Sequence, residues 1–179
     1  MKKKGTFVGL AIVIAILLLG IGYAAVSHVT LTINGSAKAT PSDNNFKVVI
    51  TNDPTPKAVV NKQAGEITAT PTATDTATAD FDITGMSQKG DKVTLTYTIK
   101  NNSADLEAKL GEPVVSFTTG DKDYFKVTST LKEGTNPLAA NGGTRDVEVV
   151  VELLKTPIDA EKECSGAVTI DAEPVQPGA

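Results

Sequence analysis

Few residues of this chain are of a type that could carry chemistry. It has one histidine, His28, and one cysteine, Cys164. A Ser-His-Asp or Cys-His arrangement would have to use His28, which we expect to be solvent-exposed. One histidine cannot build an HExxH motif or any two-histidine metal centre, and one cysteine cannot form an internal disulfide or a CxxC pair. We therefore expect no enzyme, no cofactor and no metal site.

Carboxylates are the other candidates. Cys164 lies close in sequence to Glu161 and Glu163. Because neighbouring carboxylates raise the pKa of a thiol, we expect Cys164 to fill space in the core or to be an incidental free thiol, and not to be a nucleophile. Pairs of acids stand two residues apart at three places: Asp80/Asp82, Asp121/Asp123 and Glu161/Glu163. A glycosidase would need two carboxylates about 5–10 Å apart in a sugar-sized cleft, and the chain has no tryptophan to bind a sugar ring.

Two weaker patterns remain open. Residues 120–123 (GDKD) could offer oxygens to calcium, but they do not match the DxDxDG spacing, and a solvated turn is the alternative. Asn34 and Asn101 each begin an N-x-S glycosylation pattern, which also fits a turn and a strand end.

The N-terminal segment has the layout of a secretory signal peptide. Lysines occupy positions 2–4, residues 7–19 are almost wholly aliphatic, and residues 20–24 (GIGYA) form a small-residue exit. We expect residues 1–24 to be removed by a signal peptidase, with the cut between Ala24 and Ala25, or alternatively after Ser27.

Two alternatives to cleavage by a signal peptidase stay open. Residues 7–26 are 20 in number, enough to cross a bilayer of about 30 Å as an uncleaved anchor. A prepilin leader is less well supported, because no acidic residue occurs before Asp43 and residues 29–33 alternate like a strand.

The net charge of the exported domain limits the kinds of molecule that it can bind. The net charge is −4, and losing the three leader lysines would leave −7. An acidic domain argues against nucleic acid and anionic membranes as partners. We expect a secreted protein of the extracellular matrix or cell surface, which contacts a membrane only through an uncleaved leader.

Apolar and polar residues alternate through the rest of the chain, most clearly over residues 92–100 (KVTLTYTIK). The pattern predicts an all-β fold, an antiparallel jelly-roll-like sandwich of about eight or nine strands. The expected strands are residues 29–33, 46–51, 66–70, 80–84, 92–100, 113–118, 124–131, 146–154 and 167–172.

The sandwich is predicted to be one domain over residues 25–173, with a tail over residues 174–179. Helix is limited to a turn near residues 104–110 or 158–163. The low-complexity stretch 70–79 (TPTATDTATA) is interpreted as a Thr/Ala-rich loop within the domain, with a Thr-rich edge strand or a flexible linker as alternatives.

The segment that cleavage would expose at the new N-terminus could be a strand that links one subunit to another. Residues 25–33 carry no charged side chain if His28 is neutral, and Val29, Leu31 and Ile33 alternate with threonines. Such a strand can pair within its own sheet or add to the edge of a neighbour. The second choice is heterologous and produces a head-to-tail homopolymer, with these three residues as the polymerisation strand.

The leader and a central stretch resemble the TasA/camelysin family of Gram-positive matrix-fibre proteins. The similar residues are Lys2–Lys4 with the aliphatic run, residues 20–25 (GIGYAA), Gly90-Asp91, the strand that follows, and Asn101-Asn102-Ser103. The resemblance implies a secreted jelly-roll subunit of biofilm matrix, processed by a dedicated signal peptidase, that donates its N-terminal strand to the next subunit. Some family members are metallopeptidases, and this activity is not carried over because the chain has no zinc motif.

The sequence therefore predicts an exported structural subunit of a fibre. The alternative is a monomeric secreted or membrane-anchored β-sandwich that serves as a binding module. A secreted peptidase is the weakest of the three interpretations.

Overall fold

The computed structural model describes residues 29–33, 45–63 and 65–178, the first of these by main chain alone. The predicted signal peptide, its cleavage site at Ala24 and Ala25, His28 and Asn34 lie outside the described residues. No helix in the described part of the chain has the length and hydropathy needed to span a membrane.

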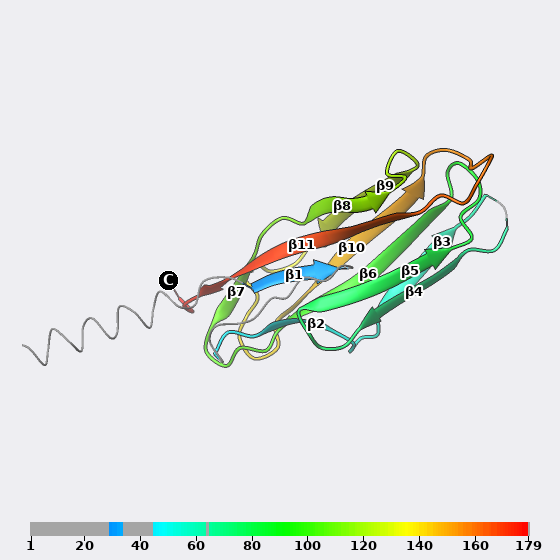
Figure 1. Cartoon of the computed structure of the whole chain (residues 1–179). Coiled ribbons are helices and arrows are strands. Elements are labelled where there is room, and N and C mark those ends of the chain that lie inside the picture. Colours follow the sequence, from blue (N-terminus) through cyan, green and yellow to red (C-terminus); the bar gives the residue numbers. More distant parts are fainter. Residues whose placement is uncertain (1–28, 34–44, 64, 179) are drawn as a thin grey trace, which may run out of the picture.

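The described chain is all-β, as predicted, and its strands form two sheets (Figure 1). The eleven strands are β1 (Val29–Ile33), β2 (Val48–Thr51), β3 (Lys57–Asn61), β4 (Thr68–Ala73), β5 (Thr78–Thr84), β6 (Lys92–Asn101), β7 (Glu107–Leu110), β8 (Val114–Gly120), β9 (Phe125–Leu131), β10 (Thr144–Leu153) and β11 (Cys164–Val175).

The first sheet, sheet A, has six strands in the order β4-β5-β1-β11-β7, and β8 also pairs with β11. The second, sheet B, has five strands in the order β2-β6-β10-β9, and β3 also pairs with β6. Neighbouring strands run antiparallel except for β1 and β5, which are parallel.

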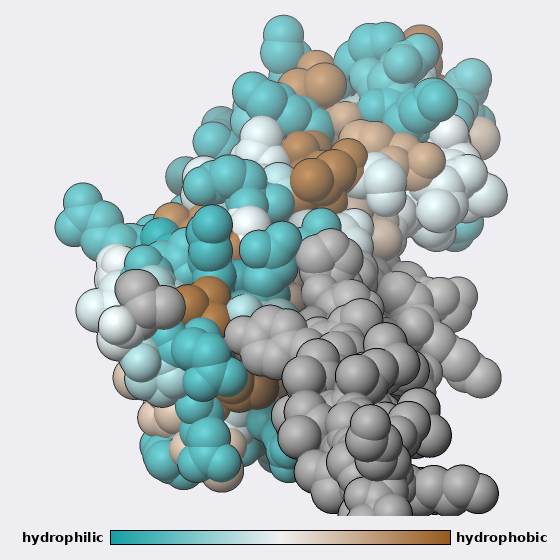
Figure 2. All heavy atoms as spheres, turned by 90° about the vertical axis from the view of Figure 1, so that its left-hand side faces the viewer, coloured by the Kyte–Doolittle hydropathy of each residue, from teal (hydrophilic) through white to brown (hydrophobic). Residues whose placement is uncertain are grey.

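The hydrophobic core lies between the sheets and follows the predicted alternation. On β6, Val93, Leu95, Tyr97 and Ile99 are fully buried, whereas the intervening Thr94 and Thr96 are partly exposed. Branched and aromatic side chains suit this arrangement because they pack well on a pleated surface. At the end of the molecule seen in Figure 2, hydrophobic residues outside the grey atoms form small groups among hydrophilic ones.

The expected strand count was too low, because β3 and β7 were not predicted. β7 has the helix-favouring sequence EAKL, yet it is a strand because it pairs with residues 172–175 of β11. Strand β3 follows Pro56 and lies at the edge of sheet B with Val59 exposed. The expected helical turn near residues 104–110 or 158–163 is absent from the described structure.

Two predicted boundaries also shift. Most of the Thr/Ala-rich stretch 70–79 is not loop: it completes β4 and begins β5, so that only residues 74–77 lie between strands. Strand β4 is an edge strand that contains Pro71, which cannot donate to a further strand. The predicted tail begins too early, because Pro174 and Val175 belong to β11 and pair with Ala108 and Glu107.

Candidate functional site

The N-terminal strand β1 fills a slot in the middle of sheet A, which we name the β1 slot. Its five residues pair antiparallel with β11, from Val29 opposite Ala172 to Ile33 opposite Val168. On its other side it pairs in parallel with β5 at two positions, Thr32 opposite Thr78 and Ile33 opposite Ala79. In this single chain the strand therefore pairs within its own sheet.

Strand β1 joins two parts of sheet A that do not pair with each other. Strands β4 and β5 lie on one side of it, and β11, β7 and β8 lie on the other. The flanking apolar residues are covered there, since Ala79 and Val168 are each 2% exposed and Ile170 is fully buried. A strand in this position completes the main-chain pairing of the sheet at a place where the flanking residues are buried.

The three predicted polymerisation residues are all in β1. In the main-chain register, Val29, Leu31 and Ile33 are opposite Ala172, Ile170 and Val168, which are the buried positions of β11. The predicted cleavage residues Ala24 and Ala25 lie outside the described residues, a few positions before β1.

Beyond the end of β1, the space between β5 and β11 continues as a cleft that we name the end cleft. Both strands extend past the tip of β1 (Figure 1), and no strand among the described residues lies between them past Ala79 and Val168. The cleft has a volume of about 610 Å³. Its walls include Phe81 and Ile83 of β5 and Cys164 and Ser165 of β11.

The floor of the end cleft belongs to the opposite sheet. Val151 and Leu153 of β10 and Phe125 of β9 line it. Phe125 is only partly buried, as is Met86 on the wall, whereas Leu153 is 1% exposed. The cleft therefore opens toward the apolar interior between the two sheets.

Acidic side chains outnumber basic ones around the cleft. Asp82, Glu161 and Glu163 line it and are exposed, and Lys162 is the one basic residue among its described lining. The Nζ of Lys162 lies 3.3 Å from Oδ1 of Asp159 and 5.3 Å from the centroid of the Tyr124 ring. Its charge is thus already engaged by groups outside the cleft.

Cys164 lies in the wall of the end cleft and is partly buried. Burial raises the pKa of its thiol, and the nearby charge of Asp121 raises it further. A thiol with a raised pKa is a weak nucleophile at neutral pH, in line with the role expected from the sequence.

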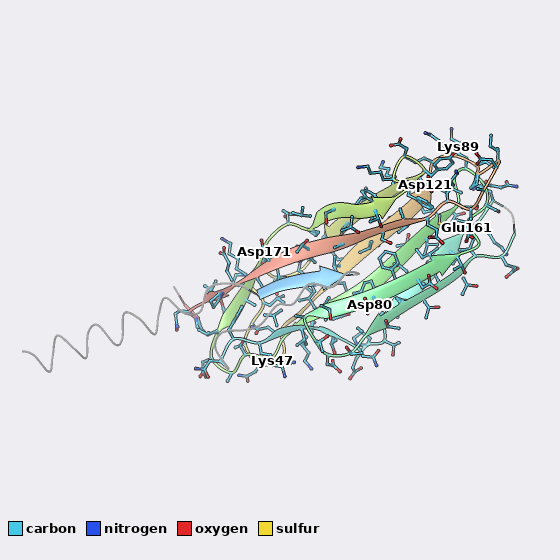
Figure 3. All side chains as sticks on the ribbon, in the orientation of Figure 1. Lys47, Asp80, Lys89, Asp121, Glu161 and Asp171 are labelled. Carbon is cyan, nitrogen blue, oxygen red and sulfur yellow. The ribbon has the colours of Figure 1, made fainter. Side chains whose placement is uncertain are left out.

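The structure brings together one acid from each of two predicted pairs. Asp121 and Glu163 are adjacent: the N–H of Asp121 donates to the carbonyl of Glu163 at 2.6 Å, and the N–H of Glu163 donates to Oδ2 of Asp121 at 3.4 Å. Figure 3 shows Asp121 and Glu161 near the same end of the molecule, away from Asp171. Among the described residues, no three His, Cys, Asp or Glu side chains form a group suited to a metal ion.

The end cleft has no counterpart among the features predicted from the sequence. Alternation correctly marks Phe81 and Ile83 as inward-facing residues of β5, but it does not indicate whether a neighbouring strand covers them. The strands expected over residues 29–33 and 167–172 are similar in length, so the sequence carries no sign that β11, with 12 residues, extends past β1, with 5.

The fold and its slot define an all-β protein of two sheets whose N-terminal strand completes the first. Comparison with protein-family models, curated proteins and solved structures finds no match to this chain.

Proposed function

We propose that this chain is an exported structural subunit of an extracellular or cell-surface fibre of the biofilm-matrix type, which assembles when β1 of one subunit enters the β1 slot of the next. The observation that carries the proposal is the position of β1, at the beginning of the described chain and between two strands that do not otherwise pair.

The β1 slot can hold either the chain's own β1 or the β1 of a second copy. A second copy presents an identical strand, so it can make the same main-chain bonds to β5 and β11 in the same register. Exchange of an identical element between protomers therefore costs few contacts, and a head-to-tail contact that does not close produces a linear polymer. The proposal assigns no enzymatic activity, no metal and no cofactor to the subunit.

Export and the finer architecture belong to the same proposal. The lysines, the aliphatic run and the small residues around Ala24 support removal of residues 1–24 before assembly. The antiparallel sheets support a jelly-roll-like sandwich. An unprocessed leader would hold β1 at a membrane and delay assembly.

A disulfide test distinguishes a β1 that enters the next subunit from a β1 that pairs within its own chain. Thr30 and Asp171 are Cα partners in the register of β1 and β11, and directly opposed residues in antiparallel strands are close enough for a disulfide. The secreted protein carrying Thr30→Cys, Asp171→Cys and Cys164→Ser should form a covalent ladder on a non-reducing gel, and electron microscopy should show filaments.

A matched variant controls for random oxidation. Lys57→Cys replaces Asp171→Cys and places the second thiol on β3 of the other sheet; it should produce no ladder. N-terminal sequencing of the secreted form should begin at Ala25. A monomer with an internal disulfide, and single particles at high concentration, would contradict the proposal.

That contrary result would favour the second candidate, a monomeric secreted or membrane-anchored binding module. The observation in its favour is that β1 pairs within its own chain in the structure. A metal-dependent proteolytic activity of the pure protein would favour a third candidate, a secreted peptidase.

A further inference from the structure

We infer that the end cleft binds an extended peptide segment in which apolar residues alternate with basic ones. This site is separate from the β1 slot, and the inference does not depend on whether the chain polymerises.

The gap between β5 and β11 has two halves that differ in the burial of the residues beside them. Where β1 lies between β5 and β11, the adjoining Ala79, Val168 and Ile170 are at most 2% exposed. Beyond the tip of β1, the inward residues Ile83 and Cys164 are only partly buried. Among the described residues, no strand lies between β5 and β11 in this second half of the gap, and its inward residues are more exposed than those of the first half.

The shape and lining of the end cleft suit an extended peptide. Its volume of about 610 Å³ is within the range of about 300–1,000 Å³ usual for ligand sites. Ile83, Met86, Phe125 and Leu153 provide apolar surface, which suits the inward-pointing side chains of an extended chain. Successive residues of a strand point to opposite faces, so every second residue of the ligand would be apolar.

The main chains of β5 and β11 border the cleft. Residues 82–84 of β5 pair with β4 on one side, and residues 164–166 of β11 pair with β8 on one side. On their other side, residues 82–84, Cys164 and Ser165 pair with no strand of the described chain, and all of them line the cleft. Added strands bind such edges through main-chain hydrogen bonds and obtain specificity from alternate side-chain pockets.

The rim of the cleft is acidic. The outward-pointing residues of the ligand would lie next to Asp82, Glu161 and Glu163, which are exposed on the rim. Lys162 does not balance them, because it pairs with Asp159 and lies over Tyr124. Complementary charge favours lysine or arginine at these positions of the ligand and steers its association.

The chain offers a direct reporter of occupancy, because Cys164 lines the cleft and is the only cysteine of the sequence. The probe is an acetylated and amidated hexapeptide, Lys-Val-Lys-Val-Lys-Val. The purified protein should bind it in fluorescence anisotropy, and saturating peptide should slow alkylation of Cys164 by iodoacetamide at least about fivefold, since a bound segment blocks access to the thiol.

Three comparison peptides test the parts of the inference. The charge-reversed peptide, with glutamate in place of lysine, should bind at least about tenfold more weakly. A version with alternate N-methylated amides should bind more weakly, because it lacks the main-chain donors along one edge of the strand. The uncharged peptide Val-Thr-Leu-Thr-Ile, which has the sequence of β1, should also bind more weakly than the basic one.

A pair of surface variants controls for general electrostatics. Asp82→Lys should weaken binding of the basic peptide at least about tenfold, whereas Asp123→Lys, an exposed residue outside the cleft lining, should change it less than about twofold.

Absence of binding, binding without protection of Cys164, or equal binding of the acidic peptide would overturn the inference. Tighter binding of the β1 peptide would also overturn it and would identify a second copy of this chain as the occupant.

Discussion

The hydroxyl of Tyr97 donates a hydrogen bond to the main-chain carbonyl of Asp80, with an oxygen–oxygen distance of 2.9 Å. Tyr97 is a fully buried residue of β6 in sheet B, and Asp80 is in β5 of sheet A. Asp80 follows Ala79, the last β5 residue opposite β1. This bond therefore joins the two sheets at the point where the β1 slot meets the end cleft.

We predict that Tyr97→Phe lowers the free energy of unfolding by about 1–2 kcal/mol, because the Asp80 carbonyl loses a buried donor. Burial raises the pKa of Tyr97, and the charge of Asp80 raises it further, so the phenol remains a donor at neutral pH. Urea denaturation measures the change. Tyr124→Phe is the control and should be close to neutral, since the ring of Tyr124 contacts lysines and would be retained. Equal losses in both variants would contradict the prediction.

A second prediction concerns Asp91, which is fully buried. Its Oδ1 accepts a hydrogen bond from the N–H of Gln63 at 2.7 Å, and its Oδ2 accepts from the N–H groups of Ser87 and Gln88, both at 2.8 Å. The carboxylate thus fixes two loops. Asp91→Ala should cost about 3 kcal/mol, because it leaves three main-chain donors without this partner. Thermal or urea denaturation would measure the loss.

The same residue predicts a pH dependence. Burial by itself raises the pKa of Asp91, but the N–H groups of Gln63, Gln88 and Ser87 lower it by more, so the pKa lies below its ordinary value of 3.8. A group whose pKa is lower in the folded state stabilises the fold above its unfolded pKa, and this contribution is lost as the pH falls toward the folded value.

The measurement is the free energy of unfolding from pH 7 down to pH 2. The difference between wild type and Asp91→Asn should be constant above about pH 5 and should shrink below about pH 4. A difference that stays constant across the whole range would show that the charge of Asp91 contributes nothing.

Strands of this chain are predictable from the sequence where the cause of their formation lies in neighbouring residues. Strand β6 was predicted almost to its ends because alternation over ten residues reflects one buried face. Strand β7 was missed because its residues favour helix, and pairing with Ala172 and neighbouring positions of β11 overrides that preference. Alternation of side chains is visible in adjacent residues, whereas pairing with a distant strand is not.

In the candidate site, too, the local pattern of β1 was predictable and its distant contacts were not. The alternating residues of β1 were identified from the sequence, including Val29, Leu31 and Ile33. Its location between β5 and β11 could not be predicted, because it depends on contacts with residues about 45 and 140 positions away in the chain. The end cleft arises from strands of unequal length meeting in space, so it has no local pattern.

A third prediction concerns Asn101, a fully buried residue at the end of β6. Its Nδ2 donates to the carbonyls of Leu106, Leu138 and Ala139 at 2.8, 3.2 and 3.1 Å, and its Oδ1 accepts from the N–H of Ser103 at 3.0 Å. Asn101→Asp would place a carboxylate against three carbonyls and should cost about 3–5 kcal/mol.

The same contacts bear on modification of Asn101. Because the amide is enclosed, folded protein should not be glycosylated at Asn101 despite the N-x-S pattern. Exposed Asn102 is the matched position, and Asn102→Asp should leave stability within about 0.5 kcal/mol. Denaturation of both variants and mass spectrometry of the protein secreted from a glycosylating host provide the check. Similar stability losses at the two positions, or a glycan on Asn101, would contradict this account.

A fourth prediction concerns the turn that supports the end cleft. Gly120 has a φ of +94°, and a Cβ at this position would lie 2.2 Å from the carbonyl oxygen of Glu163. Gly120→Ala should therefore cost at least about 2 kcal/mol, because strain and a main-chain clash add. Gly134→Ala is the control: its nearest neighbour would be the Arg145 side chain at 3.6 Å. Comparable melting temperatures for the two variants would contradict the prediction.

The last prediction concerns removal of β1. Protein that lacks residues 25–33 loses the strand between β5 and β11 and uncovers Val168 and Ile170, which are buried in the complete chain. Sheet B and the Tyr97–Asp80 bond do not include this strand. We therefore expect a folded protein that is less stable, binds a hydrophobic dye and forms no filaments.

Adding the missing strand as a separate peptide should restore stability and reduce binding of the hydrophobic dye. A synthetic peptide with the sequence of residues 25–33 can pair with β5 and β11 as β1 does, and at 100 times its dissociation constant it should stabilise the truncated protein by about 2.7 kcal/mol. A peptide with Leu31→Asp is the matched control, because it introduces a charge at the position opposite buried Ile170. Thermal melts with each peptide are the measurement. If both peptides raise the melting temperature equally, or neither does, the β1 slot does not accept a strand from outside the chain.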